Sequence, residues 1–402
     1  MQPVDQSRGA PTQGRRSKSD INHFLEVLIV ARLPATMIYF NIFHNRINRE
    51  FLGFAFVWIL FTIPIVKVLA QQRNTQLKIY GHLQYNYDKL GEENADSYFS
   101  LGEQDFFVTS NLSDRVSFLG ETVVKYDNST SSKFSPSIER AQLKFDYYKN
   151  HSIIIGKMHT PVNYWNDVYH HGRYFYPTID RPSSFSYLIP IHSLGLRMQG
   201  QNLGKWNFGY DICATNSIAS TDLFDSALNK AITAAVHLKP VDGMRIGASY
   251  YNDYMTTNTP GAHTGHGGGN SEYEGAINYE LTCFSVAYFG KHFEILSESS
   301  YNKNRTDSLG IAENYSQFIY AGWRFKEKQV IYGLFDFMDM SEKELHVSPI
   351  NVIKTGVGYK IDVNENCVMK LQFERTESGD DHLFHNHNDI RYDIRFQLAY
   401  GF

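Results

Sequence analysis

The sequence predicts an all-β fold, a transmembrane antiparallel β-barrel of about 16 strands. The first sign is the final segment, Ile390 to Phe402, in which apolar and polar residues alternate almost without error. The second is the order of the connections after residue 70, which are short and long in turn. The third is composition: 15% of the residues are aromatic, with 28 Phe and 27 Tyr. Such rings favour strands and membrane interfaces.

One face of the final segment is wholly apolar and the other is polar. The apolar row consists of Ile390, Tyr392, Ile394, Phe396, Leu398, Tyr400 and Phe402. Arg391, Asp393 and Arg395 occupy positions between them. A period of two indicates an extended strand with two unlike faces. A soluble sandwich would bury the apolar face in its core, whereas a barrel in lipid would turn that face toward the bilayer.

The connections decide between these two folds. Short polar turns are expected at 111–114, 149–151, 202–205, 240–243, 290–292, 326–328 and 362–366. Longer connections are expected at 88–97, 127–137, 159–192, 216–229, 254–272, 304–312, 340–350 and 378–388. Bacterial membrane barrels have an even number of strands, short periplasmic turns and longer outer loops. A sandwich has no reason to separate the two kinds so regularly, and no repeated propeller-blade signature is visible.

The alternation extends to the other expected strands. In the first strand, Leu77, Ile79, Leu83, Tyr85 and Tyr87 share a face opposite Lys78, Tyr80, His82, Gln84 and Asn86. Two stretches, Tyr98 to Val108 and Glu272 to Tyr288, break the alternation as a bulge would. Residues 71–402 are therefore expected to form one outer-membrane barrel.

Residues 37–70 have the layout of a secretory signal peptide. Basic residues precede Phe51 to Val66, which carries no charge, and Val68 to Ala70 has the small-residue spacing of a cleavage site. Cleavage would make Gln71 the first residue of an exported protein, and an uncleaved single-span helix is the alternative. Residues 1–36 are expected to be an over-extended or unstructured N-terminus.

Composition argues against several other classes of protein. The net charge is only −4, which gives no reason to expect nucleic-acid binding. Cys213, Cys283 and Cys367 are too few and too scattered for a disulfide framework or a zinc site. No Gly-x-Ser-x-Gly or His-Glu-x-x-His motif is present. We therefore expect that the protein is not an enzyme and has no catalytic residue or cofactor. The enzymatic alternative is a catalytic pair such as His192 and Ser193, which would need no compact motif.

Two segments stand out: Leu77-Lys78-Ile79-Tyr80-Gly81, and Ile153 to Pro161 (IIIGKMHTP), where a strand ending in Gly and a polar residue runs into a Pro-containing loop. Both are similar to segments of the phosphate-selective porin O and P family of Gram-negative outer-membrane porins. The resemblance implies a homotrimeric diffusion channel in outer-membrane lipid. It also implies lumenal Arg and Lys rows that attract anions, with phosphate as one candidate solute.

Inward-facing positions carry more basic than acidic side chains. The residues expected to line the channel are Lys78, Arg115, Arg140, Lys144, Arg197, Arg245, Arg324, Lys354, Lys370, Arg391 and Arg395, with Lys125 and Lys360 similarly placed. The acidic ones are Glu121, Glu139, Asp146, Asp211, Glu294, Glu298, Asp336, Glu374 and Asp393. Because fixed charges select the ions that enter a pore, a weak anion preference is predicted. The alternative is that these groups only pair with one another across strands.

The third long connection, His159 to His192, is rich in aromatic residues. Loops of this length usually have a function or lack order, and so aromatic a loop should not extend into solvent. We expect it to fold into the barrel as a constriction, with His170, His171, Arg173 and Arg181 near the narrowing. The alternative packs it over the rim or against a neighbouring subunit.

The remaining expectations concern partners and metals. Tyr400 and Phe402 end the terminal strand and are expected to engage the barrel-assembly machinery. Histidines at 263–266 and 382–387 fall in expected outer loops, where solvated polar residues are ordinary, so no metal site is predicted. The expected function is passive diffusion of small polar or anionic solutes. The alternative is a plugged barrel that serves as a binding or adhesion protein.

Overall fold

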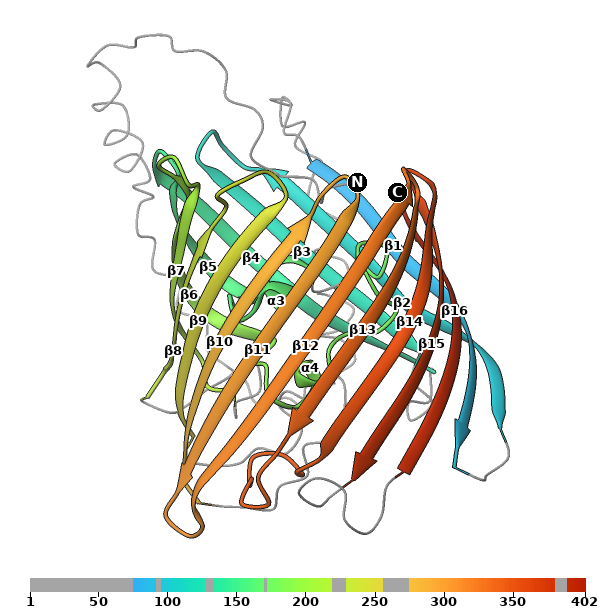
Figure 1. Ribbon diagram of the computed structural model, residues 1–402. Helices are drawn as coiled ribbons and strands as arrows, with labels where there is room; N and C mark the ends of the chain where they lie inside the picture. Colours follow the sequence, from blue (N-terminus) through green and yellow to red (C-terminus); the bar gives the residue numbers. More distant parts are fainter. Residues whose placement is uncertain are drawn as a thin grey trace, which may run out of the picture. The chain divides into compact units, whose positions relative to one another are not determined.

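The computed structural model describes residues 75–91, 95–126, 133–169, 172–218, 229–255, 275–379 and 389–402. Within them, sixteen antiparallel strands form a closed barrel in which β16 returns to pair with β1 (Figure 1). The predicted fold class and strand number are confirmed. No helix in these ranges is long and apolar enough to cross a membrane. The expected signal peptide at 37–70 and the segment 1–36 lie outside the described residues.

The sixteen strands follow one another along the chain, and the third long connection contains two short helices. The strands are β1 (Thr75–Leu90), β2 (Asp96–Asn111), β3 (Val116–Tyr126), β4 (Phe134–Tyr148), β5 (His151–His159), β6 (His192–Leu203), β7 (Phe208–Thr215), β8 (Ala231–Leu238), β9 (Met244–Met255), β10 (Ile277–Phe289), β11 (Phe293–Thr306), β12 (Gly310–Lys326), β13 (Gln329–Asp339), β14 (Asn351–Asn364), β15 (Cys367–Gly379) and β16 (Asp389–Gly401). The helices are α3 (Tyr164–Val168) and α4 (Ser184–Tyr187).

The C-terminal strand closes the barrel. β16 pairs with β1 from Gly401 opposite Tyr80 to Arg391 opposite Leu90. At the end of this seam the Ile79 N–H donates to the Phe402 carbonyl oxygen at 2.8 Å, and the Phe402 N–H donates to the Ile79 carbonyl oxygen at 3.0 Å. Closure leaves no unpaired strand edge, as a sheet surrounded by lipid requires.

Every short turn expected from the sequence is present, but the long connection expected at 304–312 is wrong. β11 continues to Thr306 and β12 begins at Gly310, so a tight turn joins them. Gly310 has a φ of 80°, which glycine adopts without strain. The polar residue Asn304 belongs to the strand because it faces inward, where its Nδ2 donates to Glu344 Oε2 at 2.7 Å.

Of the two stretches expected to be bulged, one is confirmed and one is wrong. The β1–β2 register shifts between Gly81 and Leu83, which leaves an extra residue in β2 within 98–108. β10 stays in register with both neighbours along its whole length. Its alternation looked irregular because inward residues such as Tyr279 and Leu281 are apolar and buried in a core rather than facing water.

The described residues of the third connection, 160–169 and 172–191, lie inside the barrel, and we call them the inner loop. Its two helices, α3 and α4, are surrounded by the strands (Figure 1). Tyr164, Trp165 and Phe185 are buried there, and Trp165 is 0% exposed. The inner position agrees with the placement predicted from its aromatic content.

Candidate functional site

The inner loop is anchored at α3 by a buried cluster of ion pairs. Asp167 lies 3.4 Å from Arg197 Nη2 on β6 and 2.5 Å from Arg245 Nη2 on β9. Burial opposes ionisation of this carboxyl, but the two guanidinium groups outweigh it and hold the pKa of Asp167 well below its usual range. Arg197 also lies 2.7 Å from Asp211 on β7. These pairs fix α3 to the wall formed by β6 to β9.

Backbone N–H groups of the inner loop donate to side chains that point into the barrel. These bonds join Trp165 N to Glu298 Oε1 at 2.7 Å, Ile179 N to Gln372 Oε1 at 3.0 Å, and Ser183 N to Asp336 Oδ2 at 2.7 Å. The acceptors lie on β11, β15 and β13, respectively. A buried polar group needs such a partner, so these wall residues and the loop backbone stabilise each other.

Lys370 on β15 fixes the middle of the inner loop. Lys370 is buried, with only 1% of its surface exposed. Its Nζ donates to the carbonyl oxygens of Arg173 at 2.6 Å and Thr178 at 3.1 Å. The same ammonium lies 5.9 Å from the ring centroid of Tyr176. Lys370 is therefore placed to position the loop segment that carries Arg173.

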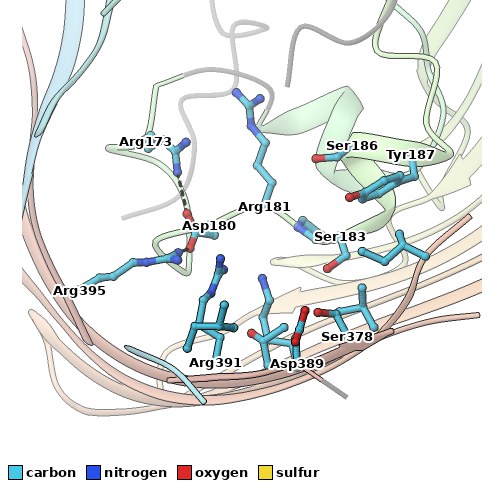
Figure 2. A pocket seen from close by; sticks show the side chains of 16 residues that line it. Arg173, Asp180, Arg181, Ser183, Ser186, Tyr187, Ser378, Asp389, Arg391 and Arg395 are labelled. Atoms are coloured by element: carbon cyan, nitrogen blue, oxygen red, sulfur yellow. Dashed lines mark hydrogen bonds and ion pairs between the residues drawn. The ribbon is translucent and has the colours of Figure 1, made fainter. Parts of the chain in front are cut away.

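The inner loop and the wall of β14 to β16 enclose a cavity of about 580 Å³ near the long-loop end of these strands (Figure 2). Its basic lining residues are Arg173, Arg181, Lys354, Arg391 and Arg395, and its acidic ones are Asp180 and Asp389. Figure 2 shows Arg173 and Arg395 converging on Asp180. Five basic side chains against two acidic ones leave this cavity with a surplus of positive charge.

Two β-bulges turn acidic side chains toward the inner loop from β2 and β4, which continue the wall beyond β16 and β1. The extra residues in β2 and β4 bring Glu103 and Glu139 inward. Lys125 Nζ lies 3.9 Å from Glu103 and 4.0 Å from Glu139. Arg181 Nη2 of the inner loop lies 3.8 Å from Glu103 Oε2. Bulges commonly re-aim side chains beside functional sites, and here they place negative charge next to Arg181 of the basic cavity.

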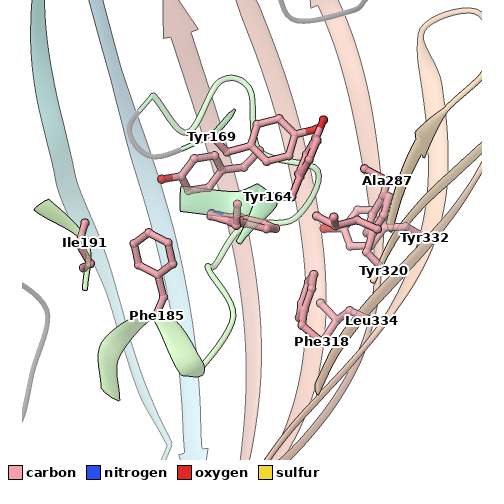
Figure 3. Packing of buried hydrophobic residues seen from close by; sticks show 12 residues of the cluster. Tyr164, Tyr169, Phe185, Ile191, Ala287, Phe318, Tyr320, Tyr332 and Leu334 are labelled. Atoms are coloured by element: carbon pink, nitrogen blue, oxygen red, sulfur yellow. The ribbon is translucent and has the colours of Figure 1, made fainter. Parts of the chain in front are cut away.

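An aromatic cluster fills the interior beside β10 to β13 (Figure 3). Trp165 is its centre, with ring centroids 5.2 Å from Tyr176 and 5.5 Å from Phe318. Tyr320 and Tyr332 of the wall pack in the same cluster. Close-packed side chains leave no room for water, so a solute path past the loop has to avoid this side.

The predicted channel-lining residues occupy several environments. Those that line the cavity are Lys354, Arg391 and Arg395. Arg395 also contacts Asp180 of the inner loop, and Arg197, Arg245 and Lys370 contact other residues of that loop. Those on β4 are Arg140, paired with Glu121, and Lys144, 3.0 Å from Asp146. Arg324 pairs with Glu294 and lies 3.5 Å from Asp362. Lys78 lies in β1 near its start, and Arg115 is exposed in the turn between β2 and β3.

The other predicted site residues are placed as follows. Arg173 and Arg181 lie on the inner loop at the cavity. His170, His171 and the histidines at 263–266 and 382–387 lie outside the described residues. The described part of the chain contains no group of three side chains suited to hold a metal ion. Tyr400 lies in β16, where its hydroxyl is 2.6 Å from Gln104 Oε1, and Phe402 follows that strand.

The site also contains Glu103, Thr376 and Ser378, which the sequence pattern did not identify. Glu103 was missed because the bulge in β2 disturbs the alternation that identifies inward positions. Thr376 lies opposite Lys354 on one side and Arg391 on the other. Aligning the expected β14, β15 and β16 hairpins by register would have placed this hydroxyl between two predicted lumenal cations.

No protein-family model matches the sequence, and no curated protein matches it. The anion-selective porin from Comamonas acidovorans is similar over 82% of this chain and 100% of its own, with a TM-score of 0.59 and 8% identity. The outer membrane channel DcaP of Acinetobacter baumannii is similar over 82% and 97%, with a TM-score of 0.54 and 11% identity. The trimer form of OmpT, an outer membrane protein of Vibrio cholerae, is similar over 82% and 99%, with a TM-score of 0.54 and 10% identity. This chain therefore has the barrel fold found in outer-membrane porins.

Proposed function

We propose that the barrel is a passive diffusion channel for small polar or anionic solutes, with a weak preference for anions. The observation that carries this proposal is the cavity between the inner loop and β14 to β16, whose basic residues outnumber its acidic ones. Fixed positive charge raises the local concentration of anions in a water-filled passage. Glu103 on β2 and Glu139 on β4 oppose this effect, so the preference is weak. Phosphate belongs to the solutes that such a passage admits.

The outer face of the barrel supports a location in outer-membrane lipid. Large apolar side chains such as Phe99, Ile155, Phe284 and Leu371 are exposed on it. So extensive an apolar surface requires lipid or a partner. The signal peptide expected at 37–70 would export the chain, and the terminal strand would engage the barrel-assembly machinery. The trimer form of a similar barrel supports a homotrimer.

A plugged barrel with a binding or adhesion role is the second candidate. The aromatic cluster around Trp165 favours it, because this cluster occupies space that an open pore would leave to water. Recordings in planar lipid bilayers separate the two candidates. A channel gives discrete current steps after insertion, whereas a plugged barrel gives none.

Replacing Arg391 tests the proposed anion preference. Its side chain is 45% exposed, and its partner Asp393 keeps Arg395 at 3.4 Å, so the change should be tolerated. Arg391→Glu reverses one charge at the cavity and is expected to shift the reversal potential in a KCl gradient toward cation selectivity. Lys326→Glu, an exposed site at the far end of β12, makes the same charge change and should shift it much less. A cation-selective parent channel, or equal shifts in both variants, would contradict the proposal.

A further inference from the structure

Three neighbouring strands present a row of hydrogen-bond donors at the cavity. Lys354 on β14 lies opposite Thr376 on β15, and Thr376 lies opposite Arg391 on β16. All three line the cavity. Neighbouring strands are about 4.8 Å apart, so the two long cationic side chains flank the hydroxyl and reach the space above it. The row thus has the composition and spacing to hold one carboxylate or phosphate group.

The donors of this row are not used up within the described part of the chain. There, the Thr376 hydroxyl is buried without a hydrogen-bond partner. No ion pair within 4.0 Å joins the Lys354 ammonium to another described residue. Arg391 uses Nε for Asp393. An unsatisfied donor away from bulk water is costly, so this row favours a ligand that carries negative charge.

The nearby carboxylates are shared between the row and a deeper cation: Arg391 pairs with Asp393, and Lys354 interacts electrostatically with Glu374 and Asp336. Glu374 and Asp393 lie one inward position deeper than the row and opposite each other. Arg395 Nη1 lies 3.5 Å from Glu374, and its Nη2 lies 3.4 Å from Asp393. Asp336, on β13, accepts hydrogen bonds from the N–H and hydroxyl of Ser183. The row of Lys354, Thr376 and Arg391 therefore stands at the mouth of a charge network in which Arg395 and Ser183 also contact the acids.

An apolar wall borders the same cavity. Tyr187 of α4, Ile350 and Val352 line it. Val352 belongs to a buried apolar cluster, and Tyr187 and Ile350 pack against that cluster. Tyr187 and Arg391 project into the cavity from opposite sides (Figure 2). One compartment thus combines a cationic row with an apolar surface.

We propose that this cavity is a binding subsite for organic anions that have a compact apolar body. The carboxylate binds the row, and the body lies against Tyr187, Ile350 and Val352. The inference rests on the proposed function and deepens it by naming the solute class. Inorganic phosphate would use the row but gain nothing from the wall, whereas each methylene buried on the wall adds about fourfold in affinity.

Calorimetric titration of the folded protein in detergent tests this subsite without requiring conductance. Benzoate is the probe, acetate and inorganic phosphate lack the apolar body, and benzyl alcohol lacks the charge. Heats for detergent micelles alone are subtracted. We expect saturable benzoate binding at least about tenfold tighter than binding of the other three, because both halves of the site contribute. Lys354→Met and Arg391→Gln should each weaken benzoate binding about tenfold.

The control variant is Lys326→Met, which removes one positive charge outside the cavity and should leave benzoate binding unchanged. Equal binding of benzoate and phosphate, equal binding of benzoate and benzyl alcohol, or no loss in the Lys354 and Arg391 variants would overturn the subsite. If the barrel conducts ions but does not bind benzoate, the subsite is overturned and the channel proposal stands. Benzoate binding by a barrel that does not conduct would overturn the channel and leave the subsite standing.

Discussion

Deleting Tyr169 to Ser184 is expected to raise the single-channel conductance several-fold. The deletion removes the part of the inner loop that Lys370, Gln372 and Asp336 hold against the wall of β13 to β15. It also removes Tyr176 from the aromatic cluster. Ion current rises with the free cross-section of a water-filled tube. Widening the barrel interior where the inner loop now lies therefore increases the conductance. Planar-bilayer recordings of inserted single molecules measure the change.

The deletion variant has to be shown to fold before its conductance is read. Barrels that fold migrate differently on gels before and after heating, and this shift provides the check. Ser186→Ala, a cavity-lining change on α4 that removes one hydroxyl, is the matched loop variant and should keep the parent conductance. An unchanged conductance in a folded deletion variant would show that the inner loop does not limit the passage.

Asp167→Asn is expected to lower the free energy of unfolding by about 3–5 kcal/mol, since it leaves Arg197 and Arg245 without a shared counter-charge. Both guanidinium groups are mostly buried beside this carboxylate. Denaturant titration followed by gel migration measures the loss. The pKa of Asp167 is lowered, so the anchor stabilises the fold above the ordinary Asp range and loses its effect only as pH falls toward the lowered value. Between neutral pH and about pH 4, the anchor's contribution should therefore change little.

A second variant separates the ion pair from a general packing defect. Asp167→Asn combined with Arg245→Met removes the cation that loses its ion-pair partner Asp167, while Arg197 keeps Asp211 as a partner. The double variant should recover part of the lost stability. Equal stability of the parent and Asp167→Asn would mean that the cluster does not anchor the loop.

Much of the fold was predictable because lipid and water impose opposite demands on the two faces of each strand. The terminal strand shows this directly, since Ile394 and Phe396 alternate with Asp393 and Arg395. The expectation failed where that contrast disappears. The inward face of β10 is apolar because it packs against the inner loop. Asn304 is polar, as loop residues usually are, but it belongs to a strand and faces inward, where Glu344 accepts its hydrogen bond.

The candidate site was less predictable than the fold. The sequence placed Arg391, Arg395 and Lys354 on inner faces, but it did not show which of them share a cavity. That depends on the path of the inner loop, which is fixed by contacts between residues far apart in sequence, such as Lys370 with Arg173. Arg197 and Arg245 illustrate the same limit, since their partner Asp167 comes from the loop rather than from a strand.

We propose that solutes pass between the inner loop and the wall of β14 to β16. Ser378→Cys, modified by a negatively charged methanethiosulfonate reagent during bilayer recording, tests it most directly because Ser378 lines that cavity. The unsubstituted chain, whose Cys213 and Cys283 are buried, is the reference. We predict that modification lowers both the single-channel conductance and the anion preference. Complete labelling of Cys at this position without any change in current would show that solutes do not pass through this cavity.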